Sequence, residues 1–239
     1  MIYKLFKSSV LICIMFFSVL VNCSGKNHNE TSEHEDKLKF LSSDHVLFGE
    51  DGEIILSVDP EASNIQWTGK KIVGQHSGLI EVLEGKVIIQ DDQIAHAQIT
   101  IDMNSIQNLD IESGKWRHKL ESHLKSEDFF KVEEFPISIF KMKSIMSIEV
   151  PDSTGHDYRL SGMLTIKDQT HDIEFPVIIE QLKEGYIASG RINIDRTLWG
   201  IHYGSGTFFS DLGDNAIDDN FTIDFKVIAT MTISEEEGE

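Results

Sequence analysis

The segment FTIDFKVIATMTI, residues 221–233, has the most regular pattern in the chain. Every second side chain in it is apolar: Phe221, Ile223, Phe225, Val227, Ala229, Met231 and Ile233. Alternation with a period of two predicts a β-strand that has one buried face and one face in water. Ile228 is the only large apolar residue between these positions. We therefore expect this strand to form part of the wall of a hydrophobic core.

The same period occurs in QIAHAQITIDM, residues 93–103, where the apolar set is Ala95, Ala97, Ile99, Ile101 and Met103. Other strand-like segments are NIQWTGK (64–70), PISIFKMKSI (136–145), RLSGMLTIK (159–167), HDIEFPVIIEQ (171–181), YIASGRINID (186–195) and both halves of KKIVGQHSGLIEVLEGKVII (70–89). The pieces EGK (84–86), QDDQ (90–93), KDQT (167–170) and KEGY (183–186) resemble turns. Because short connections join antiparallel neighbours, the sequence predicts about eight antiparallel strands.

This pattern predicts an all-β fold, either one closed barrel or a two-sheet sandwich, with one helical insertion. Long strands favour the closed barrel, since an open sheet would expose edges that aggregate. A barrel of eight strands is either packed solid or just wide enough for one elongated ligand.

The insertion begins with KWRHKLESHL, residues 115–124, where Trp116, Leu120 and Leu124 recur at a spacing of four residues. This spacing predicts an amphipathic helix. In the following HLKSEDFFKVEEFP (123–136), Ser126 is a candidate cap for a further helical turn. We expect Trp116, Phe129 and Phe130 to cover one end of the barrel.

The N-terminal 22 residues have the pattern of a cleaved export signal. Lys4 and Lys7 precede a continuous apolar run that ends before Cys23. We expect Cys23 to be lipidated, residues 23–53 to form a flexible acidic tether, residues 54–234 to form the barrel and residues 235–239 to be an acidic tail. This organisation predicts an exported, periplasm-facing and membrane-anchored lipoprotein, on the outer membrane rather than the inner one. The alternative is a removed signal followed by an unmodified Cys23.

Charge and cysteine content restrict the partners and the chemistry. The chain has 21 basic and 40 acidic residues and a formal net charge of −19. This charge excludes nucleic acid as a natural partner, since phosphate binding needs a basic face. Of the two cysteines, Cys13 lies inside the predicted signal. The mature chain therefore cannot form an internal disulfide.

Four segments carry a family resemblance: HLKSEDFFKVEEFP, GMLTIKDQTHDIEFPV (162–177), DRTLWGIHYGSGTFF (195–209) and LGDNAIDDNFTIDFKV (212–227). In this order they resemble the signatures of the YceI-like family of exported, lipocalin-like bacterial proteins. The resemblance extends over residues 54–233. It implies a lipocalin-like barrel with an interior tunnel that holds an isoprenoid, such as a prenyl phosphate or a quinone tail. Some relatives are found beside cytochromes of the b561 type.

We predict that the ligand's polar head is bound by cationic or titratable groups near aromatic runs, namely His123, Lys125, Arg196 and His202. Arg196 is the main candidate because a guanidinium can bind phosphate with two hydrogen bonds. Its alternative role is an ion pair with Asp195 or Asp128. The candidate tail-binding residues are Trp67, Phe129, Phe130, Phe175, Trp199, Tyr203 and Phe208. Their alternative role is ordinary core packing.

The sequence lacks the common catalytic motifs of hydrolases, zinc proteases and nucleotide-binding enzymes. We therefore expect a carrier without enzymatic activity, cofactor or metal, although DLGDNAIDDN (211–220) has some likeness to a calcium loop. Two alternatives are a structural or adhesive surface lipoprotein with a solidly packed barrel and a metal-dependent hydrolase. A homodimer and a membrane redox partner stay open as further associations.

Overall fold

The computed structural model describes residues 52–149 and 155–231 of the 239-residue chain. This part contains nine strands and one α-helix. The strands are β1 (Ile54–Val58), β2 (Asn64–Lys71), β3 (Gln75–Gln90), β4 (Gln93–Asn108), β5 (Ile137–Ser147), β6 (Tyr158–Ile166), β7 (Gln169–Leu182), β8 (Gly185–Asp195) and β9 (Ile217–Met231). Helix α1 (Gly114–Lys125) lies between β4 and β5, and the short 3-10 helices η2 (Arg196–Trp199) and η3 (Gly213–Asn215) lie between β8 and β9. The predicted signal sequence, Cys23, most of the tether and the acidic tail lie outside the described residues.

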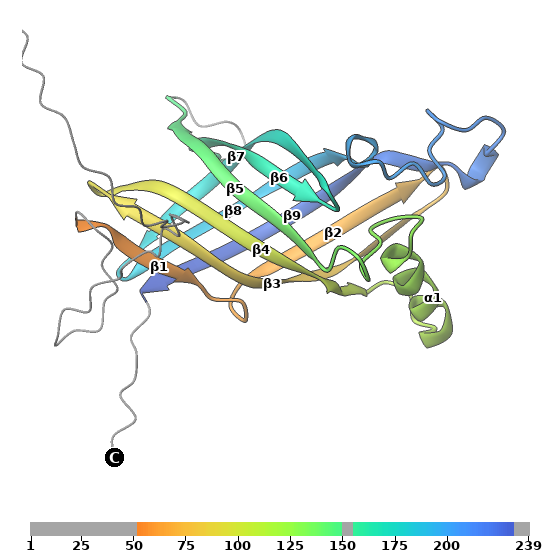
Figure 1. The fold of residues 1–239 in the computed structure, drawn as a ribbon, viewed down its shortest axis with the longest axis horizontal. Helices are drawn as coiled ribbons and strands as arrows, with labels where there is room; N and C mark the ends of the chain where they lie inside the picture. Colours follow the sequence, from red (N-terminus) through yellow and green to blue (C-terminus); the bar gives the residue numbers. More distant parts are fainter. Residues whose placement is uncertain (1–51, 150–154, 232–239) are drawn as a thin grey trace, which may run out of the picture. The chain divides into compact units, whose positions relative to one another are not determined.

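The strands form one closed antiparallel barrel (Figure 1). Its order is β1-β3-β2-β9-β8-β7-β6-β5-β4, and pairing of β3 with β4 closes it. β1 and β2 share one position in the wall, because both lie between β3 and β9. Leu56 of β1 pairs with Val87 and Met231, whereas Trp67 of β2 pairs with Gly78 and Ile223. The nine strands therefore occupy eight positions, which confirms the predicted eight-stranded barrel with one helical insertion.

Most of the predicted turns are confirmed, but one is wrong. β3 and β4 are joined by Asp91 and Asp92, whose φ angles of 51° and 61° fit a two-residue hairpin turn. EGK is not a turn, because β3 runs through it without interruption. Gly85 within it allows β1 to pack closely against β3 instead, because a Cβ at position 85 would lie 2.7 Å from Val58 Cγ2. The actual hairpin turn before β3 is Ile72–Gly74, where Gly74 has a φ of 94°.

The alternation predicted for β4 is correct from Ala97 onward but not at its beginning. Ile89 pairs with Ile94 and Ile88 pairs with His96, so Ala95 is the extra residue of a β-bulge. Ile94 consequently takes the inward position that the period had assigned to Ala95. In β9 the predicted inward series is present from Phe221 to Ala229.

We call the end of the barrel that carries α1 the helix end. It also contains the β2–β3 turn (72–74), the β6–β7 turn (167–168) and the β8–β9 connection (196–216). Leu120 and Leu124 of α1 face the barrel interior, whereas Trp116 is 57% exposed. The expectation that Trp116 covers the barrel is therefore wrong. Ser126 begins a series of turns and not a further α-helix. Its hydroxyl oxygen accepts the Asp128 backbone N–H at 3.3 Å, as a cap would, and its hydroxyl donates to the His123 carbonyl.

Candidate ligand-binding cavity

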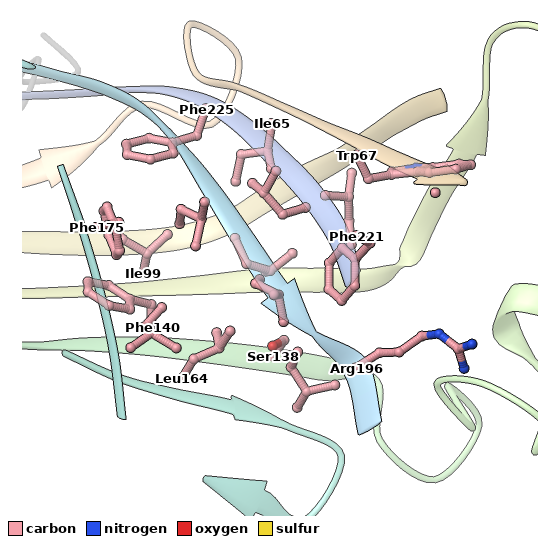
Figure 2. A pocket seen from close by; sticks show the side chains of 18 of the residues that line it. Ile65, Trp67, Ile99, Ser138, Phe140, Leu164, Phe175, Arg196, Phe221 and Phe225 are labelled. Carbon is pink, nitrogen blue, oxygen red and sulfur yellow. The ribbon is translucent and has the colours of Figure 1, made fainter. Parts of the chain in front are cut away.

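The barrel encloses a cavity of about 420 Å³ that is lined by side chains of β2 to β9 and α1. This volume lies in the range of small-molecule pockets. Figure 2 shows Phe140, Phe175 and Phe225 grouped in one part of the cavity, and Trp67, Phe221 and Arg196 in another. The rings of Phe140 and Phe225 lie 5.8 and 5.7 Å from that of Phe175. Isoleucine is the commonest residue on the remaining wall.

The cavity is elongated along the barrel. Its lining on β9 extends from Ile217 to Ala229, which at about 3.3 Å per residue corresponds to roughly 40 Å of strand. Strand tilt in barrels of this kind reduces the axial length to about 30 Å. A volume of 420 Å³ over such a length describes a narrow tunnel and not a wide chamber. A chain-like ligand fits this shape.

Two polar groups on the tunnel wall are satisfied by the protein itself. The Ser138 hydroxyl donates to the Thr165 carbonyl at 2.5 Å. The Trp67 indole N–H donates to the carbonyls of Leu79 and Gln107, at 3.2 and 3.1 Å. Because both donors already have protein acceptors, neither needs a hydrogen-bond partner from a ligand. The middle of the tunnel therefore offers an almost wholly apolar surface.

The tunnel opens at the helix end. Its solvent-exposed lining residues are in the β2–β3 hairpin and at the beginning of β9: Lys70, Lys71, Val73, Gly74, Gln75, Asp218 and Asn220. Toward the opposite end, lining residues such as Ile94, Tyr186 and Ala229 are buried or half-buried. We call the exposed set the mouth. Within the described chain, Lys70 and Lys71 form no ion pair.

One side of the mouth is formed by α1 and the turns that follow it. Leu120, Leu124, Phe129 and Phe130 line the tunnel there. The Phe130 ring packs edge-on against Phe221, with their centroids 6.4 Å apart. The predicted covering role of Phe129 and Phe130 is thus consistent with their positions.

Arg196 lies beside the mouth, but its guanidinium is held by the protein. It is 4% exposed and donates to the carbonyls of Ile201 (2.7 Å), Asp218 (3.0 Å) and Ile217 (3.2 Å). Figure 2 shows the guanidinium pointing away from the apolar lining. Burial lowers the pKa of Arg196, and the nearby carboxylates, that of Asp219 foremost, oppose this shift.

The acidic partner of Arg196 is Asp219, and the alternative pairing with Asp195 or Asp128 is wrong. Arg196 Nη2 lies 3.6 Å from Asp219 Oδ1, and the Thr207 hydroxyl donates to Asp219 Oδ2 at 2.6 Å. Asp195 instead accepts hydrogen bonds from the backbone and hydroxyl of Thr197. Asp128 contacts His123. The Arg196–Asp219 pair ties the end of β8 to the beginning of β9.

Residues 56–229 match the model of the YceI-like domain. The chain belongs to the YceI-like family. Two solved structures share its fold, each with a TM-score of 0.54: BcnA of Burkholderia cenocepacia, and a polyisoprenoid-binding domain from Saccharophagus degradans implicated in plant cell wall breakdown. The first is 22% identical and covers 72% of this chain and 99% of its own; the second is 14% identical and covers 74% and 98%. A comparison with curated proteins found no match.

The tunnel of this YceI-like barrel includes five of the predicted ligand-binding residues: Trp67, Phe129, Phe130, Phe175 and Arg196. Trp199 is 1% exposed, donates to the Leu164 carbonyl and belongs to the packed core of the helix end, outside the tunnel lining. That position agrees with core packing, the alternative considered for each aromatic residue.

The other five predicted residues lie at the helix end but outside the tunnel lining. His123 packs against the rings of Phe129 and Tyr203, and His202 stacks on Phe208 with centroids 3.8 Å apart. Lys125 Nζ donates to the Asn104 carbonyl at 2.7 Å. The segments around Phe129 and Tyr203 therefore meet, but the cationic groups of His123, Lys125 and His202 do not border the tunnel. Contact of these eleven residues with a ligand stays a prediction.

The residues that sequence reasoning missed are Lys70 and Lys71 at the mouth and His76, a half-buried lining residue next to it. Their signal was present as the segment GKKIVGQH (69–76), in which two lysines precede a glycine turn. His76 Nδ1 lies 2.8 Å from Asp110 Oδ2. Asp110 also accepts from the Ser77 backbone N–H and the Asn108 amide. This network joins the hairpin at the mouth to the segment that leads into α1.

Two classes of feature are absent from the described ranges 52–149 and 155–231. No helix there is long and apolar enough to cross a membrane. No group of three or more His, Cys, Asp or Glu side chains is arranged to hold a metal ion.

Proposed function

We propose that this YceI-like protein is a non-enzymatic carrier that holds one long-chain isoprenoid, a prenyl phosphate or a quinone-like lipid, with its tail in the tunnel. The observation that supports this most is the shape and polarity of the cavity: narrow, apolar along its length and exposed at one polar mouth. A solidly packed barrel, the form expected of an adhesive lipoprotein, is inconsistent with this cavity. The polyisoprenoid-binding domain of S. degradans has the same fold, which is compatible with the proposal.

The energetics favour a long apolar chain. Each isoprene unit has five carbons, and burial of one methylene contributes about 0.8 kcal/mol, so one unit contributes a few kcal/mol. Ordering of the chain and loss of its free motion oppose this gain. Several units in contact with the wall are therefore needed for tight binding, and the tunnel length supplies them.

The polar head would be held at the mouth by Lys70 and Lys71, while His76 beside them is oriented by Asp110. Arg196 contributes less in this arrangement, because its N–H groups already donate to three carbonyls. The two lysine ammonium groups are free to reach a phosphate or a quinone carbonyl. Asp218 and Asn220 complete the rim on the β9 side.

We also propose that the protein is exported and attached to the membrane, facing the periplasm, through acyl chains on Cys23. Residues 24–53 would then be the tether between the anchor and the barrel. Fractionation of cells that express the full chain tests this directly. Cys23→Ser should move the protein from the membrane fraction to the soluble periplasmic fraction; if it still sediments with membranes after a high-salt wash, the anchoring proposal fails.

A chain-length series tests the carrier proposal. Lipid-stripped protein is titrated with prenyl phosphates of one to several isoprene units, and binding is followed by calorimetry. Affinity should rise by at least about tenfold for each of the first added units, since each buries several methylenes, and then level off when the tunnel is full. An affinity that is independent of chain length would contradict the proposal.

A further inference from the structure

Exposed apolar side chains are concentrated at the helix end. Of twelve large apolar residues that are exposed in the described part of the chain, nine lie at this end. Two are on the β2–β3 turn, four on the β8–β9 connection, two at or just before α1 and one at the beginning of β5. The other three, Leu83, Met146 and Leu182, are on β3, β5 and β7 away from this end. Exposed apolar side chains that gather at one end of a protein mark a candidate interaction site.

The β2–β3 turn is the most exposed part of this surface. Ile72 and Val73 at its tip are 69% and 70% exposed. Polar residues are usual at such turns, so two branched apolar side chains in water require an explanation. Immediately before them, Lys70 and Lys71 are unpaired within the described chain. An apolar tip flanked by lysines suits the boundary between lipid headgroups and acyl chains, because the ammonium groups can reach lipid phosphates.

Two further segments extend the surface. Phe208 and Phe209 on the β8–β9 connection are each 51% exposed. Trp116 on α1 is 57% exposed, and Lys119 Nζ lies 5.2 Å from its ring centroid. Tryptophan beside lysine is typical of side chains that lie at the interface between membrane and water. Figure 1 shows α1, the β2 tip and the β8–β9 connection at the same end of the barrel.

We infer that the helix end is a membrane-docking surface, formed by Ile72, Val73, Trp116, Leu198, Phe208 and Phe209, that places the tunnel mouth against a lipid bilayer. The inference rests on the proposed carrier function, because it describes how the carrier would exchange its isoprenoid with the bilayer. Val73 belongs both to this surface and to the tunnel lining. A docked barrel would join the tunnel to the bilayer interior, and an isoprenoid tail could pass between them without crossing water.

The charge around the surface selects the kind of bilayer. Lys70 and Lys71 favour lipid phosphates, but Asp211 and Asp214 lie on the β8–β9 connection and the whole chain has a formal charge of −19. Strongly anionic bilayers would repel the protein beyond the immediate contact. We therefore assign a zwitterionic bilayer as the partner.

The test uses the exported chain with Cys23→Ser, so that no acyl anchor contributes, and flotation with phosphatidylcholine vesicles. Ile72→Asp with Phe209→Asp should reduce the vesicle-bound fraction by at least about tenfold. The loss of each apolar side chain should lower the partition coefficient of the protein between water and vesicles by more than tenfold. Leu83→Asp with Leu182→Asp is the matched control: it adds the same charge to exposed apolar sites elsewhere and should bind like the parent. Addition of phosphatidylglycerol to the vesicles should not strengthen binding.

Three results would overturn the inference: no flotation of the parent chain, equal losses in both double variants, or loss of a dimer in the Ile72→Asp/Phe209→Asp variant, which would identify a second copy as the partner. Mass spectrometry of extracted lipid separates this inference from the carrier proposal. Bound isoprenoid without vesicle binding contradicts docking alone. Absence of bound isoprenoid contradicts the carrier function itself.

Discussion

Arg196 and Asp219 form an ion pair beside the mouth, with Nη2 3.6 Å from Oδ1. The same guanidinium donates to the carbonyls of Ile201, Asp218 and Ile217. One buried side chain thus organises the beginning of β9 and the loop that follows η2. Its contacts predict a structural role and not the recognition of a head group.

Arg196→Ala should accordingly lower the free energy of unfolding by about 3–5 kcal/mol, because it leaves the Asp219 carboxylate and three carbonyls without their partner. Any loss of affinity should be the same for a prenyl phosphate and for the uncharged prenol. Denaturant titration and calorimetry measure the two effects. Arg191→Ala is the control, since the pair of Arg191 with Asp224 is exposed to solvent and should contribute little to stability. Selective loss of prenyl phosphate binding by a stably folded Arg196→Ala variant would restore its role in head-group recognition.

Lys70→Ala with Lys71→Ala should, unlike Arg196→Ala, weaken binding of the charged ligand without lowering stability. Affinity for a prenyl phosphate should fall by roughly 1.5–3 kcal/mol, the range for a hydrogen bond to a charged group, while prenol binding and the melting temperature hardly change. Lys183→Ala removes an exposed cation from the β7–β8 turn at the other end and should leave both affinities unaltered. Equal binding of prenyl phosphate to the parent and the double lysine variant would show that Lys70 and Lys71 do not bind the phosphate head group.

Gly78 provides a test of how Trp67 is held at the tunnel wall. A Cβ at position 78 would lie 1.8 Å from the Gln107 carbonyl oxygen and 2.6 Å from Trp67 Cζ2. Gly78→Ala should therefore destabilise the barrel by about 1–3 kcal/mol, the typical effect of overpacking, and displace the indole. Gly69→Ala is the matched control, because a Cβ there meets nothing within 4 Å. If the Gly78→Ala variant is as stable as Gly69→Ala, strands β3 and β4 can move apart at this point without a loss of stability.

The Asp110 network predicts a pH dependence of stability. Burial opposes ionisation of Asp110, but hydrogen bonds from Ser77, His76 and Asn108 outweigh it and lower the Asp110 pKa. A depressed pKa in the folded state contributes stability above the unfolded value of about 3.9 and loses it as the pH falls further. Asp110→Asn should thus be less stable than the parent at neutral pH, and the difference should shrink below about pH 4. A difference that stays constant in urea titrations from pH 7 to pH 3 would contradict this assignment.

The strand pattern was readable because it is local: alternation in residues 221–229 and 97–103 is set by which face each side chain occupies. The predictions were wrong where a residue's position depends on a partner that is far away in the sequence. Gly85 looks like a turn residue until β1 is placed against it, and Ala95 looks inward until its pairing with β3 introduces a bulge. Arg196 and Asp219 are 23 positions apart, so only the pairing of β8 with β9 brings them together. The mouth was missed at GKKIVGQH because Ile72 and Val73 read as strand residues.

The lipid content of a tunnel-blocked variant tests the central claim most directly. Ala97 faces the tunnel from β4, so Ala97→Trp should fill part of it. Lipids are extracted from equal amounts of purified parent and variant and measured by mass spectrometry. We predict about one long-chain isoprenoid per parent molecule and a loss of at least about tenfold in the variant, because a blocked tunnel gives up several kcal/mol of tail burial. Absence of lipid from the parent, or equal lipid in a folded Ala97→Trp variant, would contradict the claim that the barrel is an isoprenoid carrier.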